Sequence, residues 1–175
     1  RSVVLGDVNG DGIMDIVCGS RNSLVSVLLA NGDGTFQSAQ FFAAGNEAES
    51  VVLGDVNGDN ITDLVTANLG SDNVSVLRGT GDGTFLPAQS FPTGNGPNAL
   101  ALGDVNGDGV DDIVTTNGRI TVHIEVNTVS VLVGRSSVVD VLTLSDVTAI
   151  SNLATLQVRK AGAADFQLLS INEID

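Results

Sequence analysis

Residues 50–65 have the sequence SVVLGDVNGDNITDLV, in which acidic, amide and glycine residues lie between two short apolar runs. The same pattern is found at residues 2–17, SVVLGDVNGDGIMDIV, and at residues 99–114, ALALGDVNGDGVDDIV. The three copies are about fifty residues apart. A repeat of this length, with several short strands in each unit, is typical of propeller blades, which bury their faces only by packing on their neighbours.

Each copy has the chemistry of a calcium loop. Side-chain oxygens stand at positions 1, 3, 5 and 9, and the apolar residue at position 7 would offer its main-chain carbonyl. Ca²⁺ takes six to eight oxygen ligands in a flexible shell. Position 6 must bend the chain, and it is glycine twice and Asn60 once, the residues that best tolerate positive φ. The predicted ligands are Asp7, Asn9, Asp11, Ile13 and Asp15; Asp55, Asn57, Asp59, Ile61 and Asp63; and Asp104, Asn106, Asp108, Val110 and Asp112.

Two other interpretations of these loops compete with this one. An EF-hand ends in a bidentate glutamate at position 12 and is flanked by helices. Here position 12 is Cys18, Thr66 or Thr115, and the flanking runs are short and rich in β-branched residues, which indicates strands. The other alternative is a set of Asp/Asn/Gly turns without an ion. Three carboxylates at fixed offsets favour the metal.

A second repeated block, GDGTF, occurs at residues 32–36 and 81–85. The loops and this block resemble FG-GAP and VCBS-type repeats, the blades of integrin α-subunit propellers and of many bacterial surface proteins. The resemblance covers residues 1–134 as repeats of about 1–46, 47–95 and 96–134. The Phe-Gly-Gly-Ala-Pro signature is absent, so the VCBS-type variant is the closer match. The resemblance implies an all-β fold, a propeller-like array of about three four-stranded blades within a larger propeller, and about three Ca²⁺ ions.

Within each repeat we expect one strand before the loop, one after it, a third strand, and a fourth after the GDGTF turn, which is a hairpin signal. The third strands are predicted at residues 25–28, 74–77 and 129–132. Because neighbouring strands are antiparallel, the calcium loops and the GDGTF turns should lie at one end of each blade.

Two segments depart from the repeat. The third repeat carries an insertion in which apolar residues alternate from 120 to 126. It is either a longer hairpin that protects a sheet edge or a projection that contacts a partner through Arg119, His123 and Glu125. Residues 135–175 are interpreted as a non-repeat segment, which would be a degenerate blade, a cap or the start of another domain.

Charge and composition exclude some classes of partner and of location. The net charge is −14, and nine of the 21 acidic residues stand at positions 1, 5 and 9 of the loops. Three Ca²⁺ ions would bring the net charge to about −8. An acidic chain without a basic patch argues against nucleic acid as a partner, and no apolar run is long enough for membrane insertion. The single cysteine, Cys18, is interpreted as a small core residue.

We therefore expect a calcium-binding β-propeller module of a secreted or cell-surface protein, extracellular and bacterial, that acts in adhesion, extracellular matrix or filament assembly. Its partner would be a protein or glycan ligand, or neighbouring copies in an assembly. One histidine and one cysteine, far apart in the repeat, offer no catalytic pair, so we expect no enzyme. The alternatives are an accessory carbohydrate-binding domain of an extracellular polysaccharide-active enzyme and a structural spacer.

Overall fold

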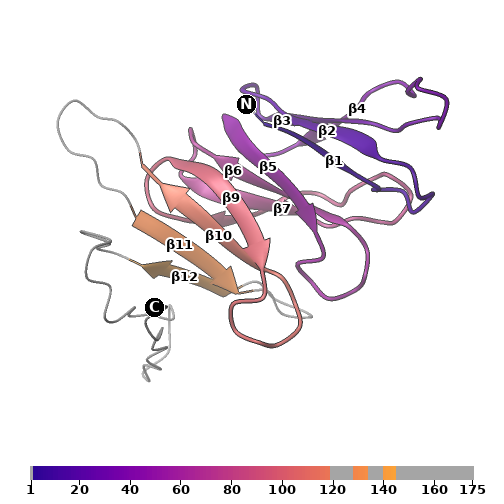
Figure 1. Ribbon diagram of the computed structural model, residues 1–175. Helices are drawn as coiled ribbons and strands as arrows, with labels where there is room; N and C mark the ends of the chain where they lie inside the picture. The colour runs from indigo at the N-terminus through magenta and orange to yellow at the C-terminus, as the bar shows by residue number, and fades with distance from the viewer. Residues whose placement is uncertain (1, 119–127, 134–139, 145–175) are drawn as a thin grey trace, which may run out of the picture.

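The computed structural model describes residues 2–118, 128–133 and 140–144, which form three four-stranded antiparallel sheets (Figure 1). In each sheet the strands follow one another in chain order. The first sheet contains β1 (Val3–Gly6), β2 (Asp15–Gly19), β3 (Leu24–Leu28) and β4 (Gln40–Ala43). The second contains β5 (Ala48–Gly54), β6 (Asp63–Asn68), β7 (Asn73–Leu77) and β8 (Gln89–Pro92). The third contains β9 (Pro97–Gly103), β10 (Asp112–Asn117), β11 (Thr128–Val133) and β12 (Asp140–Leu144).

These strands confirm the predicted all-β fold and the four-stranded units. The strands before and after each loop and the three predicted third strands are all present. The described residues contain no helix, and hence none long and apolar enough to cross a membrane. The arrangement is that of propeller-like blades.

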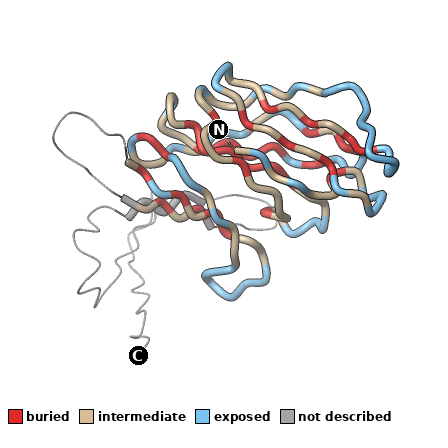
Figure 2. Tube along the Cα trace, turned by 45° about the horizontal axis from the view of Figure 1, so that its top comes forward, coloured by how far each residue is buried: buried red, intermediate tan, exposed pale blue. Residues whose placement is uncertain are grey.

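The three sheets stack face to face, with the second between the other two (Figure 1). The extent to which each sheet is buried follows from its place in the stack. All six residues of β6 are buried, whereas burial alternates along β2, so one face of the first sheet remains open. One core cluster joins the first and second sheets through Val17, Val27, Val51 and Leu64. A second joins the second and third sheets through Val65, Val76, Ile113 and Leu132. Figure 2 shows this burial along the strands, with exposed residues gathered in the loops.

A leucine and a glycine interlock at each junction between sheets. A Cβ added at Gly6 would lie 2.6 Å from Leu53 Cδ1 of the next sheet, and one at Gly54 would lie 2.6 Å from Leu102 Cδ1. Gly6 and Gly54 hold the same repeat position, as do Leu53 and Leu102. The absence of a side chain at this glycine therefore sets how closely successive sheets approach.

The third sheet takes its fourth strand, β12, from residues 140–144. It therefore extends past residue 134, where the sequence analysis ends the third repeat. No GDGTF block precedes β12, so the sequence lacks the signal that marks β4 and β8. The predicted insertion, with Arg119, His123 and Glu125, lies outside the described residues, as does the segment from residue 145 to 175.

Candidate metal centres

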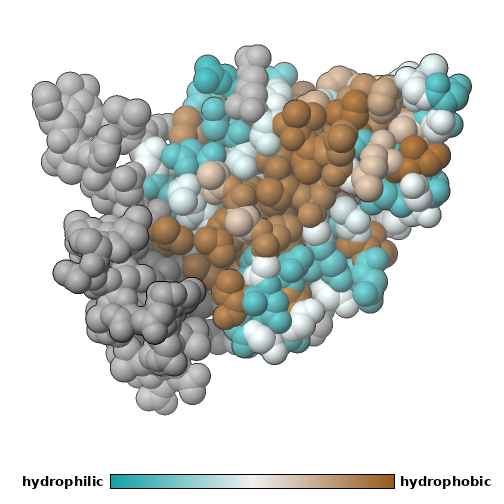
Figure 3. All heavy atoms as spheres, in the orientation of Figure 1, coloured by the Kyte–Doolittle hydropathy of each residue, from teal (hydrophilic) through white to brown (hydrophobic). Residues whose placement is uncertain are grey.

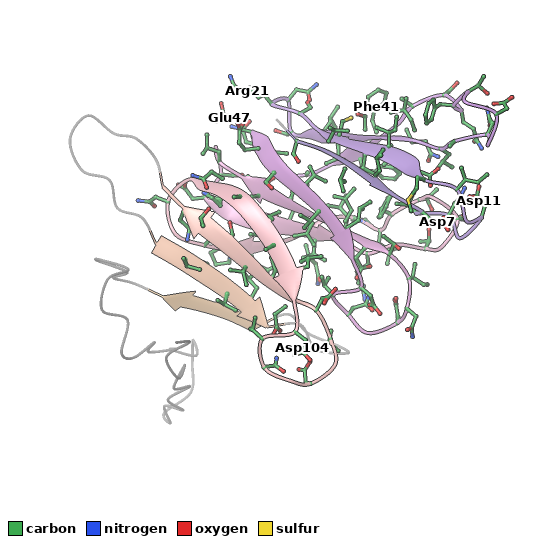
Figure 4. All side chains as sticks on the ribbon, viewed as in Figure 1. Asp7, Asp11, Arg21, Phe41, Glu47 and Asp104 are labelled. Carbon is green, nitrogen blue, oxygen red and sulfur yellow. The ribbon has the colours of Figure 1, made fainter. Side chains whose placement is uncertain are left out.

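The three predicted calcium loops occupy equivalent places, each joining the first strand of a sheet to the second (Figure 4). They leave the same end of the stack (Figure 1). In the first two sheets the turn between the third and fourth strands lies at this end too, because alternate connections of an antiparallel sheet share an edge. The expected grouping of loops and GDGTF turns is therefore confirmed.

Positive φ angles curl each loop at two positions. At position 6 the φ angle is 82° for Gly12, 63° for Asn60 and 85° for Gly109, which confirms the predicted bend. Position 4 is also in the left-handed region, with φ of 77° or 78° at Gly10, Gly58 and Gly107. The sequence-based prediction did not include this second bend. Its signal is the glycine present at position 4 in all three copies.

The first aspartate of each loop is surrounded by main-chain donors. In the first loop Asp7 accepts N–H hydrogen bonds from the residues at positions 3 to 6, at 2.7–3.3 Å. Asp55 and Asp104 accept the same four bonds, at 2.6–3.3 Å. The N–H groups, led by that of Gly12, lower the pKa of Asp7, and those led by Gly109 lower the pKa of Asp104. The main chain of each loop therefore surrounds the carboxylate of its first aspartate, and the N–H groups favour the charged form of that carboxylate.

The ninth position ties the loop to the body of the sheet. Asp15 and Asp63 are fully buried, as is Asp112. Asp63 accepts the N–H of Val56 at 3.2 Å and that of Gly79 at 2.9 Å. Asp15 makes the equivalent bonds, to Val8 at 3.1 Å and to Ala30 at 2.8 Å. This carboxylate therefore connects the loop to the chain that leaves the third strand.

Burial raises the pKa of Asp63 to about 6. The N–H bonds from Gly79 and Val56 oppose this rise, while the nearby charges of Asp59 and Asp55 add to it. Burial and the two neighbouring carboxylates thus disfavour the charged form of Asp63. A bound cation would stabilise that charged form.

The side chains at positions 3, 5 and 9 meet in pairs. Asn9 Nδ2 lies 2.9 Å from Asp11 Oδ2, and Asn57 Nδ2 lies 3.0 Å from Asp59 Oδ2. In the third loop Asn106 Nδ2 instead lies 3.2 Å from Asp112 Oδ1, which joins positions 3 and 9. In the described part of the chain no group of three or more His, Cys, Asp or Glu side chains is placed to hold a metal. The three carboxylates of each loop are therefore not gathered around one metal position in this structure.

The complete donor set of each loop nevertheless fits a hard cation. It consists of three carboxylates, one amide oxygen and the carbonyl at position 7, all of them oxygen donors. The side chain of Ile13 at position 7 is half-buried and lies against Gly32 of the GDGTF turn. No nitrogen or sulfur ligand belongs to the set, so its chemistry suits Ca²⁺ rather than a softer metal.

The acids of the GDGTF turns have a different role. Asp82 Oδ1 accepts bonds from the Thr80 hydroxyl and from both the hydroxyl and the N–H of Thr84. The Thr80 hydroxyl, followed by that of Thr84, lowers the pKa of Asp82 to about 2. Thr35 lowers the pKa of Asp33 in the same way. Asp33 and Asp82 therefore stabilise the turns in which they lie by accepting hydrogen bonds within them.

The turn of the second sheet also contacts the first loop. Gly83 N–H donates to the carbonyl of Val8 at 3.2 Å, and a Cβ at Gly83 would lie 2.8 Å from Leu29. The first loop is therefore built partly by the neighbouring sheet. This contact is not predicted from the sequence, because a linear pattern does not show which residues of different repeats touch.

Comparison with known protein families identifies the repeat. A family model described as FG-GAP-like repeat matches residues 7–66 and 55–115. Each match begins at the first aspartate of a loop and ends just beyond the following loop, within the next second strand. Together the two matches cover all three loops and more than half of the chain. No curated protein matches the chain.

Proposed function

The chain belongs to the FG-GAP-like repeat family, whose repeats form β-propeller-type modules, and from this premise we propose that each of its three loops binds one Ca²⁺ ion. The observation that carries the proposal is the same main-chain wrapping of the first aspartate in all three loops, with a buried ninth aspartate beside it.

The three aspartates of each loop would have different roles in binding the ion. The first aspartate is fixed by its N–H donors, while the exposed fifth aspartate is held only within the loop tip. In the first two loops the ninth aspartate accepts one N–H from its own loop and one from the chain just after the third strand. Calcium bound among them would supply the positive charge that offsets mutual repulsion of three carboxylates. It would thereby hold the loop against the sheet.

Calcium would act mainly as a folding ligand. An ion that binds only the native state stabilises it by about 2.7 kcal/mol per site when its concentration is 100 times the Kd. We expect thermal melts in millimolar calcium to show a clearly higher Tm than melts in excess chelator, with Mg²⁺ as the control cation. An identical Tm in calcium and in chelator would contradict the proposal.

Calcium affinity should depend on pH at the second loop. Because burial raises the pKa of Asp63 to about 6, a proton competes with the ion below that pH. We expect the Kd of this loop to rise by up to about tenfold per pH unit between pH 6 and pH 5. The metal-free chain behaves in the opposite way: a folded pKa above the unfolded value makes Asp63 destabilising above about pH 6, so that its penalty shrinks as pH falls toward 4.

Calcium titrations of a variant carrying Asp11→Ala and Asp108→Ala isolate the second loop, and we would run them at pH 7, 6 and 5. Equal affinity at all three values would show that Asp63 takes no part in binding.

We propose that the module works outside the cell, in a secreted or surface protein, as a binding unit rather than an enzyme. Repeats of this family typically occur in extracellular proteins, where calcium is abundant enough to fill weak sites. The loops lie at one end of the stack, which leaves the connections at the other end as the surface for a protein or glycan in adhesion, matrix or filament assembly. Binding of calcium-loaded chain to immobilised matrix proteins or glycans tests this; binding to neither would contradict it.

A further inference from the structure

One main-chain hydrogen bond links the first loop to the GDGTF turn of the neighbouring sheet. Gly83 N–H, in the turn of the second sheet, donates to the carbonyl of Val8 at 3.2 Å. Gly10, at position 4 of the loop, lies beside the same turn, since a Cβ built on it would be 3.9 Å from the carbonyl oxygen of Gly81. The turn therefore contacts the loop at two of its positions.

Val8 joins this turn to the first and ninth aspartates of the loop. Its N–H donates to Asp15 Oδ2 at 3.1 Å. Its carbonyl belongs to the same peptide group as the N–H of Asn9, which donates to Asp7 Oδ1 at 3.3 Å. A donor at the carbonyl polarises that peptide group and strengthens its N–H as a donor. The bond from Gly83 therefore acts on Asp7 through one peptide group.

The side chain of Val8 is buried although it belongs to a loop. In Figure 3 hydrophilic residues gather along the lower edge, where Figure 1 places the second and third loops. Val8 is instead 2% exposed and belongs to the core cluster that contains Leu29 and Phe85. Phe85 ends the GDGTF block of the second sheet. Packing and hydrogen bonding therefore hold the same loop residue against the same turn.

Gly83 presents its N–H in this way because it carries no side chain. Its φ angle is 84°, and a Cβ built on it would lie 2.8 Å from Leu29 Cδ1. Gly34 holds the same place in the turn of the first sheet, with a φ angle of 87°. No described residue beyond its chain neighbours lies within 4 Å of a Cβ built on Gly34. The two glycines thus share a backbone conformation but differ in their surroundings.

We propose that Gly83 is a positioning residue for the first calcium loop, so that the calcium affinity of a loop in the first sheet depends on a turn of the second sheet. The inference rests on the proposed binding of calcium. Gly83 would act through Val8, which its N–H holds in place, and through Val8 on Asp7. A bond that orders a ligand before the ion binds lowers the cost of ordering it on binding.

Calorimetric calcium titration at pH 7 tests this in a background where only the first loop binds. Asp59→Ala and Asp108→Ala provide that background by removing an exposed ligand from each of the other loops. We expect Gly83→Ala to raise the Kd of the first loop about tenfold, the effect of losing one hydrogen bond. Gly34→Ala is the matched control, since it places the same backbone strain in the first sheet's own turn, and it should change the Kd less than about twofold.

The second loop shows whether the effect is directed at one site. A background of Asp11→Ala and Asp108→Ala isolates it. The N–H of Gly79, just before the turn, donates to Asp63 of this loop at 2.9 Å, so a general loosening of the turn would weaken this loop at least as much as the first. We expect Gly83→Ala to change its Kd less than about twofold.

A second pair of variants avoids alanine at a positive φ angle. Asp82 is exposed and accepts the hydroxyl hydrogen bonds of Thr80 and Thr84. Asp82→Ala therefore loosens the turn that presents Gly83 without changing the core, and it should raise the Kd of the first loop about threefold. Asp33→Ala, at the same place in the first sheet, is its control and should leave that Kd unchanged.

The outcomes separate this inference from the proposed function. Circular dichroism first verifies that each variant is folded. A first loop that binds no calcium in its isolating background would overturn the function and this inference together. A first loop that binds with the same Kd in the Gly83→Ala and Asp82→Ala chains would overturn the positioning role alone. So would an equal rise in Kd with Gly34→Ala, or an equal loss at the second loop.

Discussion

Asp63→Ala is expected to destabilise the metal-free chain by about 3 kcal/mol, whereas Asp59→Ala should change its stability by less than about 0.5 kcal/mol. Asp63 is fully buried, and its loss leaves the N–H groups of Val56 and Gly79 without their acceptor. An unsatisfied buried donor costs about 1–3 kcal/mol. Asp59 is exposed on the loop tip, where water replaces its hydrogen bonds.

Urea unfolding at pH 5 in excess chelator measures these differences, because Asp63 is mostly protonated there and its charge penalty does not offset the lost hydrogen bonds. Asp63→Asn is the matched control, because its amide oxygen keeps one acceptor and should cost less than alanine. In calcium both alanine variants should bind one ion fewer than the wild-type chain, since both remove a ligand of the second loop. If Asp63→Ala and Asp59→Ala were equally stable in chelator, the anchoring role assigned to the ninth position would be wrong.

Phe85→Ala is expected to cost about 3–4 kcal/mol, whereas Phe36→Ala at the same place in the first sheet should cost under about 1 kcal/mol. Phe85 is 8% exposed and joins the core between the first two sheets. Its ring meets that of Phe42 edge to face, with centroids 5.3 Å apart. Phe36 is 41% exposed.

The comparison isolates stacking between sheets from the turn itself, because both residues end a GDGTF block. Urea unfolding of the wild-type chain and of both variants at one protein concentration measures the two losses in free energy of unfolding. Equal losses for the two variants would mean that the phenylalanine stabilises its own turn and not the junction.

The sequence predicts those features that are local and repeated. Oxygen-bearing residues at alternate positions, with glycine or Asn60 at position 6, define the loops, and the β-branched runs beside them define the strands. Both follow from short-range chemistry, namely the left-handed backbone that position 6 needs and the pleated surface that β-branched side chains fill.

Contacts between repeats are harder to predict because they join residues far apart in the chain. The bond from Gly83 to Val8 and the seat of Leu53 on Gly6 depend on how the sheets stack. The role of Asp63 is likewise invisible in the pattern, which marks it as a ligand but not as the acceptor of Gly79 N–H. The position of the fourth strand of the third sheet is not predicted, because no GDGTF turn precedes β12.

A calorimetric calcium titration of the full chain at pH 7 tests the central claim most directly. We predict about three ions per chain, together with a rise in Tm, and no binding by a variant carrying Asp11→Ala, Asp59→Ala and Asp108→Ala. These three residues are exposed at the loop tips, so the variant should remain folded for the comparison. A folded wild-type chain that takes up no calcium, or a triple variant that binds as the wild type does, would contradict the account.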